Sequence, residues 1–152
     1  MRSSANPGRD TPLTWFLAAL IGVAAAAAVP LGEWPPEPWN FLGLVPLAFG
    51  LALALAAERQ FARAGTPVRP FKEPTALVTD GAFRFSRNPM YLGLVLVLAG
   101  AALLLSSPLA LVAAPAYGAW VQARFVAREE RQLEERFGDA YRAYRRRVRR
   151  WV

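Results

Sequence analysis

The stretch that decides the fold is Gly81-Ala82-Phe83-Arg84-Phe85-Ser86-Arg87-Asn88-Pro89-Met90-Tyr91-Leu92-Gly93. It brings polar and aromatic side chains up to the start of an apolar run, residues 90–108. A second apolar run follows directly, and the charged segment Arg128-Glu129-Glu130 comes after it. Two apolar helices joined by a short turn would return this charged segment to the level of the first stretch. We therefore expect the two polar segments to meet at one edge of a membrane.

The apolar residues of this 152-residue chain are concentrated in four blocks. The composition is 55% hydrophobic and 19% charged, and the blocks cover residues 12–30, 40–57, 90–108 and 109–123, the last interrupted by Pro115. A helix rises about 1.5 Å per residue, so about 20 residues cross a hydrocarbon core of about 30 Å. The pattern predicts an all-α, polytopic membrane protein with about four transmembrane helices and a C-terminal cytoplasmic helix.

A single domain accounts for residues 1–152. We expect residues 1–11 to form a mobile cytoplasmic N-terminus, residues 12–65 to hold two spans, and residues 66–152 to form the functional core. A cleaved signal peptide is the alternative for the first block, with small residues at 24–28 as the cleavage region. The length of the first block and the three further blocks favour a retained span.

The distribution of charge predicts the orientation. All 18 Lys and Arg residues lie before the first block, between the second and third, or after the fourth. The two opposite loops contain Glu33 and Glu37 in one case and no charge around Ser106-Ser107-Pro108 in the other. Since basic loops stay cytoplasmic during insertion, both termini and the middle loop are expected on the cytoplasmic side of a cell (inner) membrane.

The formal charge of +7 and the basic tract at residues 145–150 raise the alternative of nucleic-acid binding. In a membrane protein, such a tract more often lies against anionic lipid headgroups, where each cation contributes about 1 kcal/mol. We therefore expect the lipid bilayer as a partner and no nucleic acid. The chain has no Cys and no His. This excludes disulfides, thiol catalysis and histidine chemistry, and we expect no metal.

Two local features have competing interpretations. Asn88 and Pro89 suit the N-cap and first position of the third span, which would be a purely structural role. After the fourth span, a charged helix is predicted from Gln122 to about Phe137, with Gly138 as its C-cap.

Within that charged helix, Glu129 shares a four-residue spacing with Leu133 and Phe137, a row that Tyr141 would continue. This places Glu129 on the inward face, where a carboxylate needs a partner. Arg87 or Arg128 could serve, and so could the hydroxyl groups of a ligand. Glu130 and Glu134 are expected to point elsewhere and to pair with neighbouring Arg residues.

Taken together, these motifs resemble the isoprenylcysteine carboxyl methyltransferase family, whose relatives include the phospholipid N-methyltransferases. The resemblance rests on Leu77-Val78-Thr79-x-Gly81-x-Phe83, Arg87-Asn88-Pro89-Met90-Tyr91-x-Gly93 and Glu129-Glu130-x-x-Leu133-x-x-x-Phe137-Gly138-x-x-Tyr141-x-x-Tyr144. It covers about residues 66–152, which it makes a methyltransferase-like core. The order and spacing of the series carry the resemblance, because each piece alone occurs by chance.

The resemblance implies an integral membrane methyltransferase that uses S-adenosyl-L-methionine, with the C-terminal helix covering the cofactor pocket at the cytoplasmic face. Carried over by position, the cofactor-binding residues would be Ala76, Leu77, Val78, Phe83, Asn88, Pro89, Met90, Tyr91 and Glu129. Glu129 would accept hydrogen bonds from the ribose hydroxyls. Candidate substrate-binding residues are Arg87, Arg124 and Arg128, and no residue is assigned as a dedicated catalytic base.

Two positions depart from the family pattern. Asn88 stands where a His is often found, so a histidine base is excluded. Phe125 stands where prenylcysteine enzymes have an Arg for the substrate carboxylate, with Arg124 and Arg128 beside it. Methyl transfer from a sulfonium needs mainly alignment and exclusion of water, so it tolerates both changes.

The function predicted from these features is methyl transfer to a carboxylate or amine of a lipophilic, membrane-embedded substrate. A non-catalytic membrane subunit, in which Glu129 pairs with Arg87 or Arg128, is one alternative. A nicotinamide-dependent membrane reductase of the sterol-reductase type is another. The sequence does not specify the methyl acceptor or the oligomeric state.

Overall fold

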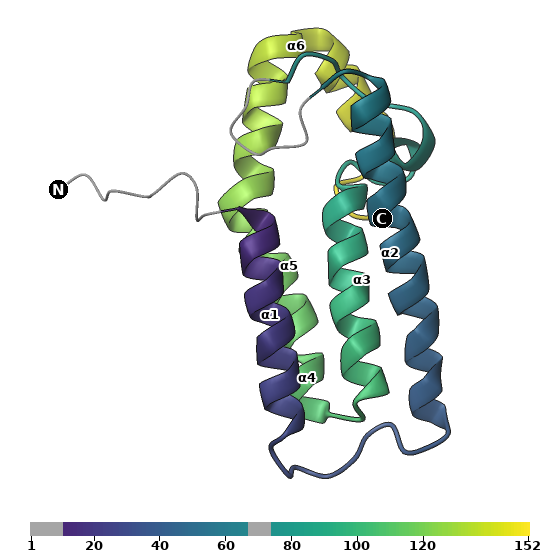
Figure 1. The fold of residues 1–152 in the computed structure, drawn as a ribbon. Helices are drawn as coiled ribbons and strands as arrows, with labels where there is room; N and C mark the ends of the chain where they lie inside the picture. The colour runs from purple at the N-terminus through teal and green to yellow at the C-terminus, as the bar shows by residue number, and fades with distance from the viewer. Residues whose placement is uncertain (1–10, 67–73) are drawn as a thin grey trace, which may run out of the picture.

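A computed structural model describes residues 11–66 and 74–152 of the chain. Residues 1–10 and 67–73 lie outside the described residues, so the predicted mobility of the N-terminus and the path of part of the middle loop stay predictions. Within the described residues every regular element is a helix, which confirms the all-α prediction. The long helices form a bundle whose connections gather at its two ends (Figure 1).

The first two apolar blocks form α1 (Pro12–Ala27) and α2 (Leu44–Arg63). Thr11 caps α1, because its hydroxyl accepts a hydrogen bond from the Thr14 amide at 3.2 Å. A 3₁₀ turn, η1 (Trp39–Gly43), leads into α2, which continues past the apolar block into the charged start of the middle loop.

The third block forms α3 (Pro89–Leu104). The fourth is divided into α4 (Pro108–Leu111), α5 (Ala113–Val121) and a π-helical turn, η3 (Gln122–Val126), which runs into α6 (Ala127–Arg147). Figure 1 shows α2 and α3 side by side, α1 beside α4 and α5, and α6 arching over the end of the bundle opposite the loop between α1 and α2.

The number of spans is established only in part. Among the described residues, two helical stretches are long and apolar enough to cross a membrane, Trp39–Arg63 and Pro108–Arg147. Pro12–Ala27 and Pro89–Leu104 are apolar but shorter, at 16 residues each. Large apolar side chains are exposed along the outer surface of α1 and α2, including Ile21 at 71% and Val45 at 66%. Water would not favour such a surface, whereas lipid would.

The end of the charged helix differs from the prediction. Gly138 has a positive φ of 50°, which favours glycine, but its ψ of −119° is not that of the predicted left-handed C-cap. The chain then re-enters a helix and continues to Arg147, so Gly138 is a kink inside α6. The second part of α6 is held because Tyr141 and Tyr144, three residues apart, are both buried (1% and 3% exposed).

Candidate functional site

The Arg87-Asn88-Pro89-Met90-Tyr91 motif lies where the middle loop enters α3. A 3₁₀ turn, η2 (Gly81–Arg84), precedes it, and Pro89 starts α3 as predicted. Asn88 occupies the N-cap position, but its side chain makes no capping hydrogen bond. Instead its Nδ2 donates to the carbonyl oxygen of Arg150 at 3.1 Å. Asn88 is therefore the N-cap residue by position, as predicted, but its side chain bonds the C-terminal tail and not the first turn of α3.

The two polar segments singled out in the sequence meet at one hydrogen bond. The Tyr91 hydroxyl donates to Oε1 of Glu129 at 2.8 Å, although the residues are 38 positions apart. Tyr91 is 3% exposed. Glu129 therefore lies on the inward face of α6, as its spacing predicts. Of the partners considered, Arg87 pairs with Glu130 instead, and the residue that donates to Glu129 is a tyrosine.

Glu130 is buried, contrary to the prediction that it points away. It is 8% exposed, and it accepts from Arg150 at 2.7 and 3.1 Å and pairs with Arg87 at 3.3 Å. Neighbouring helical residues lie about 100° apart, so both glutamates can face inward only where elements flank two sides of the helix. The C-terminal tail supplies that second side. Glu134 behaves as predicted and pairs with Arg142 and Arg145 at the surface.

The three candidate substrate-binding arginines lie in different surroundings. The Arg87 side chain is 9% exposed, and besides Glu130 it contacts the Tyr141 hydroxyl at 3.4 Å. Its Nε is buried without a hydrogen-bond partner. Arg124 and Arg128 are exposed. The structure thus brings Arg87 to the meeting point of the two motifs and leaves Arg124 and Arg128 on the outer side of η3 and α6.

The apolar residues proposed for the cofactor form a wall beside this point. Val78 and Phe83 are buried in one cluster with Ala57, Tyr141 and Tyr144. Leu77 and Met90 pack against that cluster and are partly exposed, as is Ala76. The predicted apolar residues therefore share one region under the kinked α6.

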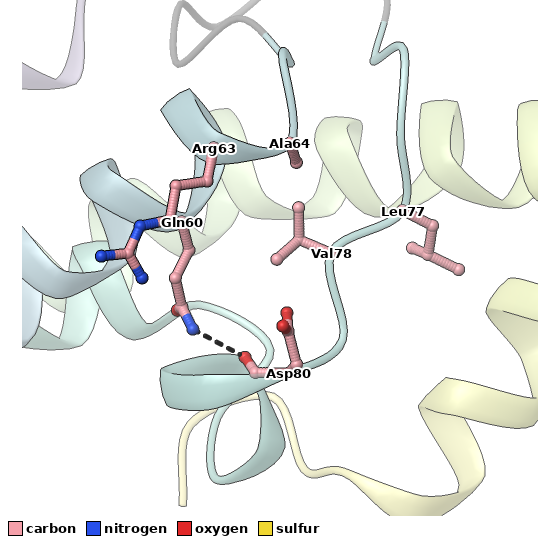
Figure 2. Close-up of a pocket in the computed structure, with 6 residues that line it drawn as sticks. All are labelled: Gln60, Arg63, Ala64, Leu77, Val78 and Asp80. Atoms are coloured by element: carbon pink, nitrogen blue, oxygen red, sulfur yellow. Dashed lines mark hydrogen bonds between the residues drawn. The ribbon is translucent and has the colours of Figure 1, made fainter.

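A cavity of about 270 Å³ opens between the end of α2 and this wall (Figure 2). Its lining comprises Gln60, Arg63, Ala64, Leu77, Val78 and Asp80. Gln60 fixes the facing turn at both ends of its amide: Nε2 donates to the Asp80 carbonyl oxygen at 3.1 Å, and Oε1 accepts from the Ala82 amide at 3.2 Å. The cavity is near the lower limit of small-molecule sites, about 300 Å³.

Comparison with known proteins yields one family. The phospholipid methyltransferase family matches residues 39–140, from the turn before α2 to the second part of α6. The chain belongs to the phospholipid methyltransferase family. This is a family of lipid methyltransferases in membranes. The matched residues include both halves of the candidate site, the segment of Tyr91 and the segment of Glu129.

Two further comparisons add little about activity. An uncharacterized protein of Haemophilus influenzae is 41% identical over 63 residues, which cover 41% of this chain and 100% of that protein. No solved structure matches the chain.

Several residues of this family member's site were missed by sequence reasoning. Gln60 belonged to none of the sequence motifs. Ser86 and Arg150 carried no pattern of their own, although Ser86 Oγ donates to the Arg150 carbonyl oxygen at 3.2 Å. The Tyr144 hydroxyl donates to the Phe83 carbonyl oxygen at 2.7 Å, and the repeated tyrosine spacing of α6 was the one available indication of this contact. Across residues 11–66 and 74–152, no group of three or more His, Cys, Asp or Glu residues could hold a metal.

Proposed function

We propose that the chain transfers a methyl group from S-adenosyl-L-methionine to a carboxylate or amine of a lipophilic substrate at the cytoplasmic face of the membrane. The observation that carries the proposal is the hydrogen bond between Tyr91 and Glu129. It joins the two motif segments that the family match contains. Nothing in the helical fold alone requires a tyrosine and a carboxylate to meet at this point.

The residues present fit the proposed cofactor. Tyr91 uses one acceptor site of Glu129, whereas a carboxylate offers about four, so a ribose diol could donate to the same group. Leu77, Val78 and Met90 supply the apolar surface that a purine ring would need. When bound, S-adenosyl-L-methionine would supply a methyl group on a positively charged sulfur. The acceptor lone pair would attack the methyl carbon in line, and the sulfur would leave as a neutral thioether.

The chain's own contribution to catalysis would be positioning. Tyr91 and Glu129 would hold the ribose, and the tyrosines of α6 would cover the site and exclude water. Orientation and water exclusion together can lower a barrier by several kcal/mol. No residue is required as a dedicated base, since a carboxylate or a neutral amine attacks without one.

The proposal also places all four apolar helices across the membrane. The 16 residues of α1 or α3 span about 24 Å, somewhat less than a hydrocarbon core of about 30 Å. Modest mismatch of this kind is accommodated by local thinning of the bilayer. With four spans, both termini lie on the cytoplasmic side, where the basic segments predict them.

This topology can be tested with reporters. A fluorescent reporter fused after Val152 should be active in the cytoplasm. A phosphatase reporter inserted in the loop at residues 31–38 should be active outside the inner membrane. An active phosphatase after Val152 would overturn both the topology and the cytoplasmic position of the site.

Cofactor binding is the direct test of the function. Titration of the folded, detergent-purified protein with S-adenosyl-L-methionine in a calorimeter should give a dissociation constant in the micromolar range. Labelled methyl groups should then be transferred to a component of a membrane lipid extract. Absence of binding, together with binding of a nicotinamide cofactor, would replace the methyltransferase by a reductase. Absence of both would favour a non-catalytic subunit.

A further inference from the structure

The last residues of the chain fold back onto the motif at the start of α3. The carbonyl oxygen of Arg149 accepts from the Arg87 amide at 3.0 Å. The next carbonyl, that of Arg150, accepts from both Ser86 Oγ at 3.2 Å and Asn88 Nδ2 at 3.1 Å. Three consecutive residues of the motif loop are therefore bonded to two consecutive residues of the tail.

The side chain of Arg150 adds a second contact, to Glu130 of α6. Its Nε and Nη2 bond to the two oxygens of Glu130 at 3.1 and 2.7 Å, a forked geometry that suits a carboxylate. The same carboxylate pairs with Arg87. The hydrogen bond to Glu130 raises the pKa of the Arg150 guanidinium, and burial opposes that rise.

The neighbours of Arg150 anchor the tail on both sides. Val148 packs against the cluster that contains Phe83 and Tyr144. Trp151 packs against the core of the helical bundle, and its Nε1 donates to Oε1 of Gln122 at 2.7 Å. The basic tract was expected to lie on lipid headgroups as a whole. The Arg150 side chain, 35% exposed, pairs with the buried Glu130, whereas the side chains of Arg146, Arg147 and Arg149 are exposed.

We propose that residues 148–152 form a strap that positions the cofactor site, with Arg150 as its positioning residue. Arg150 holds Glu130, Glu130 orients Arg87, and the Arg150 carbonyl oxygen holds Asn88. Asn88 lies three positions before Tyr91, whose hydroxyl donates to Glu129. Without the Arg150 side chain, Glu130 would lose two hydrogen bonds and keep only the longer contact to Arg87 at 3.3 Å, so the loop would loosen. This role in binding rests on the proposed function, but the contacts that hold the loop do not.

The test compares Arg150→Gln with Arg149→Gln in the full-length protein. Arg149 contributes a backbone carbonyl to the strap and exposes its side chain, so its substitution is a matched control. We expect Arg150→Gln to weaken S-adenosyl-L-methionine binding by about tenfold or more, and Arg149→Gln to change it less than about twofold. Arg150→Lys should recover part of the loss. The double variant Glu130→Gln/Arg150→Gln should lose less than the two single losses combined, because both single substitutions break the same Glu130–Arg150 ion pair.

Amide hydrogen exchange provides a readout that does not need the cofactor. Arg150→Gln should speed exchange at the Arg87 amide, and Arg149→Gln should not. Equal exchange and equal affinity in the two variants would overturn the strap. If the wild-type protein does not bind S-adenosyl-L-methionine, the proposed function fails, and faster exchange at Arg87 in Arg150→Gln alone still supports the strap. Unchanged exchange would then overturn it as well.

Discussion

Replacing Glu129 by alanine is expected to weaken S-adenosyl-L-methionine binding on the order of 100-fold. The substitution would remove the acceptor proposed for two ribose hydroxyls, and hydrogen bonds to a charged group contribute about 1.5–3 kcal/mol each. It also removes the partner of the Tyr91 hydroxyl, now 2.8 Å away, and leaves a buried phenol without an acceptor. Calorimetry on the purified protein measures the affinity, and the melting temperature in the same detergent reports whether the variant is folded.

Glu134→Ala is the matched control for this measurement. Glu134 lies on the same helix but pairs with the half-exposed Arg142 and Arg145, and surface pairs of this kind contribute about 1 kcal/mol at most. Its replacement should leave cofactor affinity nearly unchanged. Equal losses in Glu129→Ala and Glu134→Ala would remove Glu129 from the site. Tyr91→Phe should give an intermediate loss, because it keeps the buried ring and deletes only the hydroxyl that orients Glu129.

Local periodicity is the part of the site that sequence could predict. Glu129, Leu133 and Phe137 share a four-residue spacing, and the last two do pack against the cluster that contains Tyr141. A helix fixes which side chains share a face, so the inward position of Glu129 followed from spacing alone. The positive φ of Gly138 also fits its residue type, since glycine has no Cβ to oppose it.

Contacts between distant segments could not be predicted in this way. Glu130 is buried because Arg150 returns to it across 20 residues, and the path of the tail depends on the kink at Gly138. A C-cap glycine predicts that a helix ends, but not that a second helix begins directly after it. The tail was therefore expected to lie on lipid headgroups, and Arg87 was expected to be available for a substrate.

The crossing of α2 and α3 combines both kinds of information. The sequence placed Gly93 and Gly100 seven residues apart on one face, suitable for a close helix contact inside the bundle or between chains. The structure places the contact inside the bundle. A Cβ atom on Gly93 would lie 2.5 Å from the Gly50 carbonyl oxygen, and one on Gly100 would lie 2.6 Å from that of Gly43. The nearest atoms to each added Cβ are backbone atoms of the facing helix, which cannot move aside as a flexible side chain could.

Gly93→Ala is therefore expected to lower the melting temperature of the protein clearly. Overpacking of a tight contact costs about 1–3 kcal/mol, more than the roughly 1 kcal/mol that alanine gains over glycine in a helix. Gly22→Ala in α1 is the control: no atom lies within 4 Å of its added Cβ, so it should be neutral or stabilising. Thermal unfolding in detergent compares the two, and equal melting temperatures would mean that α2 and α3 do not cross at these glycines.

The same variant should also weaken cofactor binding, and this links the helix crossing to the site. Gly93 lies two residues after Tyr91, so separating α3 from α2 must displace the segment that carries the Tyr91 hydroxyl. The Tyr91–Glu129 hydrogen bond tolerates little displacement, since such bonds weaken steeply with distance and angle. Gly93→Ala should thus lose affinity even at temperatures where it stays folded, whereas Gly22→Ala should not. A Gly93→Ala protein that melts early but binds with unchanged affinity would show that the site is positioned by α6 and the tail rather than by the α2–α3 crossing.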